Sequence, residues 1–141
     1  MKRSASAVWT GDLKSGKGTI STESGVLSDT PYSFKTRFEQ GTGTNPEELI
    51  GAAHAGCFSM ALSVELGKAG LVAERIATKA DVTLEQKADG FAITAIHLTL
   101  DAKVPGASQS GFDQAVQAAK IGCPVSKLFR ADITLDATLE A

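Results

Sequence analysis

The residues from Asn45 to Lys68, NPEELIGAAHAGCFSMALSVELGK, carry the signals of one long helix. Asn45 can accept a hydrogen bond from the free amides of a helix, Pro46 fixes the first helical torsion, and two glutamates follow at the positive end of the helix dipole. This segment contains no proline after Pro46, and Gly67 or Gly70 can end the helix. We therefore expect about 20 to 24 helical residues, a length of about 30 to 36 Å at about 1.5 Å per residue.

The composition of this helix predicts that it is buried. Between Leu49 and Leu66, apolar or very small residues occupy almost its whole circumference, which is typical of a helix buried on all sides. The neighbour that packs there belongs either to the same chain or to a second subunit. Small residues that let another backbone approach closely lie near the start of the helix, at Gly51, Ala52, Ala53, Ala55 and Gly56.

Strands are predicted before the helix. Glycines divide residues 8–22, VWTGDLKSGKGTIST, into two short runs that favour a hairpin. The segment Ser33–Phe38 alternates, with two phenylalanines and Thr36 on one face and Lys35 and Arg37 on the other. This alternation predicts a third strand.

Strands and helices alternate after the long helix. Residues 78–84 and 91–100 alternate on either side of a turn at 88–90, which predicts an antiparallel hairpin. Residues 110–121 are spaced as a helix, a second helical turn follows from Cys123 to Phe129, and residues 131–139 alternate as a closing strand. The order predicts an α+β fold with antiparallel sheets.

Composition and charge exclude several classes. The 141 residues suit one domain, which we expect to span residues 1–141. The 14 lysines and arginines against 16 aspartates and glutamates give a net charge of −2, so nucleic acid and membrane surfaces are not expected as partners. The start, MKRSASAVWTGDL, is not followed by an apolar run suited to a signal peptide, so we expect a cytoplasmic protein.

The two cysteines, Cys57 and Cys123, need an explanation in a reducing compartment, where a permanent structural disulfide is not expected. A buried cysteine such as Cys57 is most often a small hydrophobe without chemistry. Cys123 precedes Pro124 at the predicted cap of a short helix, where amides and the dipole stabilise a thiolate. A redox cycle needs one thiolate to attack and a second to resolve the sulfenic acid. Sequence spacing does not show whether the two sulfurs meet.

Arg37 and Glu47 each have two interpretations. Arg37 is either a solvated surface charge or the partner of a thiolate. Glu47 is either a helix-dipole partner or part of a site. Glu47 lies about 15 Å from Cys57 along an ideal helix, so the two do not touch directly. An arginine can bridge such a gap by holding a carboxylate on one side and a thiolate or peroxide oxygen on the other, provided that the fold places it there.

Other sites have weaker support in the sequence. His54 lies three residues before Cys57 on the same helical face, but no acyl-transfer motif accompanies this cysteine and histidine pair. His54, Cys57, His97 and Cys123 lack the paired spacing of zinc ligands, so no metal site is expected. The tryptophan and the six phenylalanines are too scattered for a stacking platform, and most are expected in the core.

Four segments resemble the OsmC/Ohr family, and its OsmC branch in particular. The most specific elements are an Asn-Pro-Glu helix start with a cysteine ten residues after the glutamate, and a later Gly-Cys-Pro-Val element. The resemblance covers nearly the whole chain. The four segments are STESGVL at 21–27, PYSFKTRFE at 31–39, GTNPEELIGAAHAGCFSMALS at 43–63 and AAKIGCPVSKLFRADITLDATL at 118–139.

The resemblance implies antiparallel sheets packed around a long buried central helix, in an intertwined homodimer with two sites at the subunit interface. It also implies a thiol-dependent peroxidase that reduces organic hydroperoxides to alcohols, in settings of oxidative or osmotic stress. By this resemblance Cys57 matches the peroxidatic cysteine, Cys123 the resolving cysteine, Arg37 the arginine that activates the thiolate, and Glu47 the carboxylate that holds this arginine.

The implied cycle passes through a Cys57 sulfenic acid and a Cys57–Cys123 disulfide, which an external dithiol reduces. A lipoyl protein is one candidate reductant, and no metal, haem or flavin is expected. Two alternatives stay open. One is a protein that senses or binds hydroperoxides with the same cysteines and does not turn over, and the other is a dimeric packing module in which both cysteines belong to the core.

Overall fold

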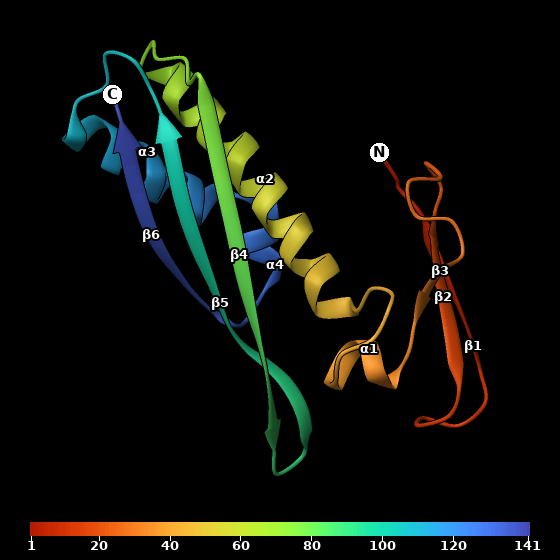
Figure 1. Cartoon of the computed structure of the whole chain (residues 1–141). Coiled ribbons are helices and arrows are strands. Elements are labelled where there is room, and N and C mark those ends of the chain that lie inside the picture. Colours follow the sequence, from red (N-terminus) through yellow and green to blue (C-terminus); the bar gives the residue numbers. More distant parts are fainter. The chain divides into compact units, whose positions relative to one another are not determined.

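A computed structural model describes all residues from Met1 to Ala141. The chain divides into two compact units, an N-terminal unit of residues Met1–Leu49 and a C-terminal unit of residues Ile50–Ala141. Helices and strands occur in both units, which confirms the α+β class (Figure 1). The single domain expected for residues 1–141 stays a prediction.

The N-terminal unit begins with a three-stranded antiparallel sheet. Its strands β1 (Ala5–Thr10), β2 (Lys17–Thr22) and β3 (Thr30–Tyr32) pair in the order β1-β2-β3. The turn after β1 is held by Asp12, whose Oδ1 accepts hydrogen bonds from the amide and the hydroxyl of Ser15, each at 2.7 Å. The predicted hairpin is therefore confirmed as β1 and β2.

Glycine is required at position 18 of β2, because two aromatic rings close over it. A Cβ at Gly18 would lie 2.4 Å from the Tyr32 ring and 2.7 Å from the Trp9 ring. The centroids of these two rings are 5.5 Å apart. The ring pair is thus packed directly against the backbone of the strand.

The strand predicted at Ser33–Phe38 is wrong, because this segment contains the short helix α1 (Phe34–Phe38). Ser33 Oγ accepts a hydrogen bond from the Thr36 amide at 3.4 Å, and Thr36 Oγ1 accepts one from the Ser33 amide at 2.8 Å. This reciprocal capping box stabilises a helix start, and it competes with the hydrogen bonds that a strand would make.

Helix α2 (Pro46–Lys68) confirms the predicted long helix. Asn45 caps its start, since Asn45 Oδ1 accepts a hydrogen bond from the Glu48 amide at 2.8 Å. Gly70 follows its end with a φ of 72°, a left-handed conformation that glycine adopts without strain.

Only one face of α2 is buried in the chain by itself. Phe58, Leu62 and Leu66 are fully buried, whereas Met60 is 74% exposed and Val64 is 58% exposed. Burial on all sides is therefore not observed in the single chain. By length and composition α2 is also apolar enough to cross a membrane, a property that the core helices of soluble proteins share.

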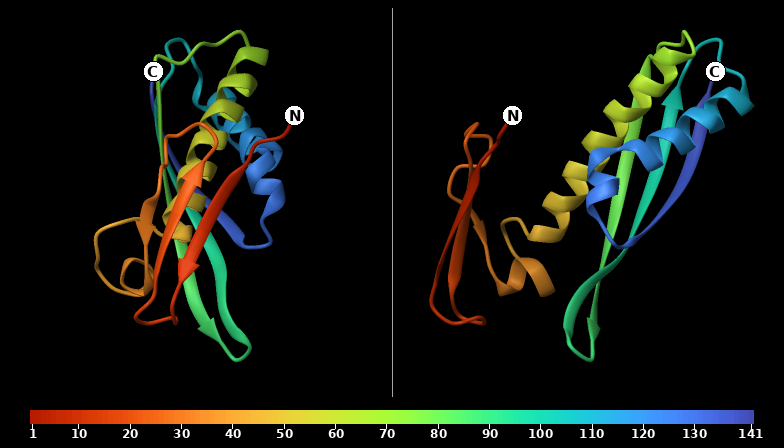
Figure 2. Two further views of the ribbon diagram at one scale, coloured as in Figure 1. Left: turned by 90° about the vertical axis from the view of Figure 1, so that its right-hand side faces the viewer. Right: turned by 180° about the vertical axis from the view of Figure 1, so that it is seen from behind.

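The C-terminal unit is a three-stranded sheet with helices on one face (Figure 2). Strands β4 and β5 form the predicted hairpin, and the predicted helices and closing strand follow. The elements are β4 (Arg75–Lys87), β5 (Gly90–Lys103), α3 (Gln109–Gly122), α4 (Pro124–Leu128) and β6 (Asp132–Glu140).

Strand β6 pairs with β5 in parallel, whereas β4 pairs with β5 antiparallel. The antiparallel prediction is therefore wrong for the β5–β6 pair. Helices α3 and α4 form a crossover that returns the chain to the start of β5, so β6 runs in the same direction as β5.

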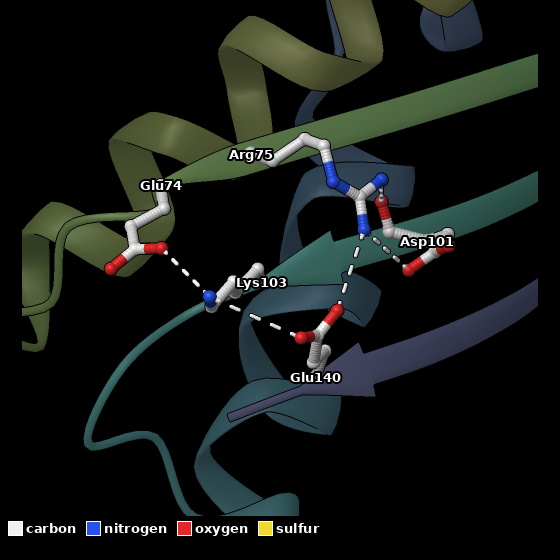
Figure 3. Close-up of polar contacts among 5 residues, drawn as sticks. All are labelled: Glu74, Arg75, Asp101, Lys103 and Glu140. Carbon is white, nitrogen blue, oxygen red and sulfur yellow. Dashed lines mark hydrogen bonds and ion pairs between the residues drawn. The ribbon is translucent and has the colours of Figure 1, made fainter.

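The outward face of this sheet carries ion pairs at one end (Figure 3). Arg75 Nη2 lies 3.1 Å from Asp101 Oδ1 and 3.9 Å from Glu140 Oε2. Lys103 Nζ lies 3.2 Å from Glu74 Oε2 and 4.0 Å from Glu140 Oε1. Such exposed pairs add little to stability. Because Arg75, Lys103 and Glu140 lie opposite one another in the three strands, the pairs favour this register over a shifted one.

The inward face of the sheet packs against the helices and forms the core of the C-terminal unit. Alternate residues of β5 turn inward, as the sequence alternation predicts. The largest fully buried side chains are those of Phe58, Leu62, Leu66, Ile96, Leu98, Leu100, Val104 and Phe112, together with His54 and Cys123.

Replacing Leu62 by alanine tests this core. Leu62 is fully buried, so Leu62→Ala is expected to lower the free energy of unfolding by about 2 to 5 kcal/mol through lost burial and a residual cavity. Val72→Ala is the matched control, because Val72 is 82% exposed and its truncation is expected to change stability by no more than about 0.5 kcal/mol. Urea unfolding of both variants gives the measurement, and equal midpoints would contradict the packing described.

Candidate functional site

The fold brings the two cysteines into contact. Cys57 comes from the middle of α2, and Cys123 lies between α3 and α4. Their Sγ atoms are 3.1 Å apart, and both are free thiols. The bonded distance in a disulfide is about 2.05 Å, so the two sulfurs need only a small approach to form one. The meeting of the sulfurs, which the sequence left open, is thus observed.

Cys123 is fixed at the corner between two helices. Its amide donates a hydrogen bond to the Ala119 carbonyl at 2.9 Å, and its carbonyl accepts one from the Lys127 amide at 3.1 Å. Pro124 occupies the first turn of α4, so Cys123 is the residue that caps this helix. The predicted cap position is confirmed, and the backbone on both sides of the thiol is held.

The two thiols differ in exposure. Cys123 is fully buried, whereas Cys57 is half-buried. A reagent from solvent therefore reaches Cys57 more readily than Cys123. This order is what an attacking and a resolving thiol require.

The two thiols also differ in acidity. Burial raises the pKa of the Cys57 thiol, and its hydrogen bond with Cys123 raises it further. Burial opposes ionisation of Cys123 as well, but its polar surroundings at Cys57 and the start of α4 outweigh burial and lower the pKa of Cys123. The surroundings of Cys57 within this unit thus disfavour its thiolate, which a positive group beside the sulfur would favour.

The N-terminal unit holds the second predicted pair, Arg37 and Glu47. Arg37 Nε and Nη2 both donate to Glu47 Oε1, at 3.0 and 2.9 Å. The Glu47 side chain is only 11% exposed, whereas that of Arg37 is 38% exposed. The guanidinium carbon of Arg37 also lies 5.4 Å from the centroid of the Phe38 ring. The carboxylate and the ring hold the arginine, and part of its guanidinium stays accessible.

A cavity of about 300 Å³ in the N-terminal unit adjoins this arginine. Its wall is mainly aromatic and aliphatic, and Arg37 is its only charged side chain. The aromatic residues that the sequence analysis expected mainly in the core thus partly line a cavity. The lining residues are Trp9, Leu13, Tyr32, Ser33, Phe34, Arg37, Phe38 and Pro46.

The two histidines do not take the alternative roles considered for them. His54 is fully buried, and its Nε2 lies 2.7 Å from Ser126 Oγ, while its Nδ1 has no partner. Its ring therefore makes no hydrogen bond to Cys57. His97 lies on the outward face of the sheet, 2.5 Å from Thr134 Oγ1 and 2.9 Å from Asp136 Oδ2. The set of four zinc ligands is not assembled.

Ser126 is a residue of this region that the sequence analysis missed. It follows Cys123 by three residues in the first turn of α4. Its hydroxyl lies 2.7 Å from His54 Nε2 of α2. The helical turn predicted from Cys123 to Phe129 already contained Ser126, so this turn is the signal that could have identified it.

The sequence has close relatives among known proteins. The family model described as OsmC-like protein matches residues 39–138. Peroxiredoxin OsmC of Escherichia coli (strain K12) is 59% identical over 135 residues, which cover 96% of this chain and 94% of that protein. A protein of the same name from Shigella flexneri matches to the same extent.

Solved structures share the fold. The organic hydroperoxide resistance protein OhrB of Bacillus subtilis superposes with a TM-score of 0.68 at 26% identity, covering 97% of this chain and 98% of that chain. An OsmC-like protein from Mycoplasma pneumoniae reaches a TM-score of 0.78 at 14% identity, covering 100% of this chain and 99% of that chain, and it supports the fold alone. Since the family model, the sequence identity and the fold agree, the chain belongs to the OsmC family.

Proposed function

We propose that the protein is a cysteine-based peroxidase of the peroxiredoxin type that reduces organic hydroperoxides to alcohols. The observation that carries the proposal is the contact at 3.1 Å between the accessible Cys57 sulfur and the buried Cys123 sulfur. The relatives add support, because one is named a peroxiredoxin and another an organic hydroperoxide resistance protein.

In the first step, the Cys57 thiolate attacks the outer oxygen of the hydroperoxide. The O–O bond breaks, an S–O bond forms, and the alkoxide leaves and takes up a proton to become the alcohol. Cys57 is oxidised to a sulfenic acid, and the hydroperoxide is reduced. Cys57 fits this role because its sulfur is the more exposed of the two.

In the second step, the Cys123 thiolate attacks the sulfur of the Cys57 sulfenic acid. The S–S bond forms, the S–O bond breaks, and the leaving hydroxide takes a proton to become water. The lowered pKa of Cys123 favours the thiolate that this step requires. An external dithiol then exchanges with the disulfide, restores both thiols and is itself oxidised. A lipoyl protein is our candidate for this dithiol, and the cycle needs no bound cofactor.

In this proposal, Arg37 is the source of the positive charge that favours the Cys57 thiolate. The pKa of Cys57 is raised by burial and by Cys123, so a guanidinium beside the sulfur would shift ionisation toward the reactive thiolate. Glu47 would orient this guanidinium through the two hydrogen bonds that it accepts.

A homodimer is part of the proposal, and it would bring the exposed face of α2 against a second copy of the chain. Met60 and Val64 on this face are exposed, and clustered exposed apolar residues mark interaction surfaces. The small residues Ala53 and Gly56 on the same exposed face permit close helix contact. We place the protein in the cytoplasm, where thiols are kept reduced.

The apolar cavity beside Arg37 would receive the hydrocarbon part of the hydroperoxide. Its volume of about 300 Å³ suits a small alkyl or aryl group. Burial of that group gains free energy that hydrogen peroxide, which has no apolar surface, does not gain.

One equivalent of cumene hydroperoxide added to the reduced protein tests the cysteine assignment. We expect the loss of two hydrogens in intact mass and a linked peptide joining Cys57 to Cys123. Cys57→Ser is expected to abolish reduction, whereas Cys123→Ser is expected to reduce one equivalent and then to overoxidise at Cys57. Unchanged native thiols would reject the peroxidase, and a disulfide that several dithiols fail to recycle would indicate a sensor.

Replacing Arg37 tests the activation of Cys57. Arg37→Ala is expected to slow Cys57 oxidation by about 10- to 100-fold and to raise the pKa of the Cys57 thiol. Lys35→Ala, an exposed cation on the same short helix, is the control and is expected to leave both unchanged. Rapid mixing with cumene hydroperoxide across a pH series measures the rate, and an equal rate and pH profile in Arg37→Ala would remove its role.

Substrate comparison tests the cavity. We expect kcat/KM for cumene hydroperoxide to exceed that for hydrogen peroxide, and Trp9→Ala to lower only the former, by about 10-fold. Val8→Ala is the matched control, because Val8 is the neighbouring residue of β1 and is 62% exposed outside the cavity. An equal loss for both substrates in Trp9→Ala would show that the ring supports the fold and does not bind the substrate.

A further inference from the structure

The turn between β1 and β2 places an apolar side chain at the cavity of the N-terminal unit. Leu13 is 64% exposed, and it lines the cavity of about 300 Å³ whose wall includes Arg37. Single exposed apolar residues are ordinary on a protein surface. Leu13 differs from them because it lines this cavity, and the other apolar residues of the wall are all less exposed. Its role is therefore to be sought in what the cavity binds.

Hydrogen bonds within residues 11–16 hold this turn in one shape. Asp12 Oδ1 accepts from the amide and the hydroxyl of Ser15, each at 2.7 Å, and the Asp12 carbonyl accepts from the Gly16 amide at 2.9 Å. The hydrogen bonds from Ser15 lower the pKa of Asp12, so its carboxylate persists at neutral pH. The backbone around Leu13 is thus fixed before any ligand binds.

Trp9 fixes the same turn against the wall of the cavity. Trp9 Nε1 donates a hydrogen bond to the Gly11 carbonyl at 3.0 Å. A Cβ at Gly16 would lie 2.9 Å from the Trp9 ring, so the backbone of the turn packs directly against the indole. The Trp9 ring also lines the cavity. Leu13 is therefore held in a defined position beside an aromatic wall.

A preformed apolar side chain favours the binding of a hydrocarbon in two ways. A bound hydrocarbon removes part of the exposed surface of Leu13 from water, and the free energy gained grows with the area covered. The turn needs no ordering when the ligand arrives, so little of this gain is lost to conformational entropy. A large alkyl or aryl group gains most from the contact, and hydrogen peroxide gains nothing.

We propose that Leu13 is a specificity-determining residue, which contacts the hydrocarbon part of the hydroperoxide and favours large alkyl and aryl groups over small ones. Asp12 is the positioning residue that holds Leu13 there. The inference rests on the proposed peroxidase function, and it assigns no bond-breaking step to the turn. In that function the O–O bond breaks at Cys57, so Leu13 and Asp12 change which hydroperoxide is preferred and leave the chemistry at the sulfur unaltered.

A series of substrates of increasing size tests Leu13. Leu13→Ala is expected to lower kcat/KM about 5-fold for cumene hydroperoxide and about 2-fold for tert-butyl hydroperoxide, and to leave that for hydrogen peroxide unchanged. Leu13→Met, which keeps the volume of the side chain, is expected to retain the wild-type order. Val26→Ala is the matched control, because Val26 is 84% exposed in the turn between β2 and β3 and does not line the cavity. An equal loss for all three substrates in Leu13→Ala, or no loss for any, would overturn the proposal.

Variants of Asp12 test the positioning of Leu13. Asp12→Ala removes the acceptor of two hydrogen bonds, and the freed turn is expected to lower the ratio of kcat/KM for cumene hydroperoxide to that for hydrogen peroxide about 3-fold. Asp12→Asn is expected to restore this ratio, because an amide oxygen can accept the same two hydrogen bonds. A wild-type ratio in Asp12→Ala would remove the positioning role of Asp12.

A binding measurement without peroxide separates this inference from the peroxidase itself. Trp9 is the sole tryptophan of the chain and lines the cavity, so its fluorescence reports an occupied cavity. The probe is 2-phenylpropan-2-ol, the alcohol formed from cumene hydroperoxide, titrated into Cys57→Ser. Adding Leu13→Ala to this variant is expected to raise the Kd about 5-fold, and adding Val26→Ala to leave it unchanged. If the wild type reduces no hydroperoxide, the proposed function fails, while weaker binding by Leu13→Ala still supports the contact with Leu13. Equal Kd values with and without Leu13→Ala, or no binding of the alcohol, would refute that contact.

Discussion

The contact between the Cys57 and Cys123 sulfurs depends on how α2 packs against the corner of α3 and α4. Cys123 is held there because its backbone ends one helix and begins the next. Buried leucines and phenylalanines of α2 and α3 hold the two helices together around it. The two sulfurs lie 3.1 Å apart with no disulfide bond between them. After oxidation of Cys57, a disulfide can therefore form without a large change in the fold.

The two cysteines differ in how readily they ionise. The polar surroundings of Cys123 lower its pKa and favour the thiolate there, while burial raises the pKa of Cys57 and disfavours it. A peroxidase built on this pair therefore has a resolving thiol prepared by its own unit and an attacking thiol that depends on a cation from elsewhere. In the proposed cycle this cation is Arg37, which two hydrogen bonds to Glu47 hold within the N-terminal unit.

The exposed apolar residues of α2 form a surface suited to contact with another chain. A helix with an apolar composition on every side was expected to be buried, yet the chain by itself covers only one face. The proposed homodimer resolves this difference, because a second copy would cover what the first exposes. The small residues on α2 would then serve close packing between subunits.

The sequence by itself determined the elements whose signals are local. The cap at Asn45, the alternation of β4 and β5 and the proline after Cys123 each act through neighbouring residues, and each prediction matches the structure. Local signals also misled at Ser33–Phe38, where two hydrogen bonds of a capping box outweigh an alternating pattern. Only the tertiary structure decided the parallel pairing of β6, the meeting of the sulfurs and the His54–Ser126 contact, because residues 37 to 72 positions apart are brought together by packing that no local pattern encodes.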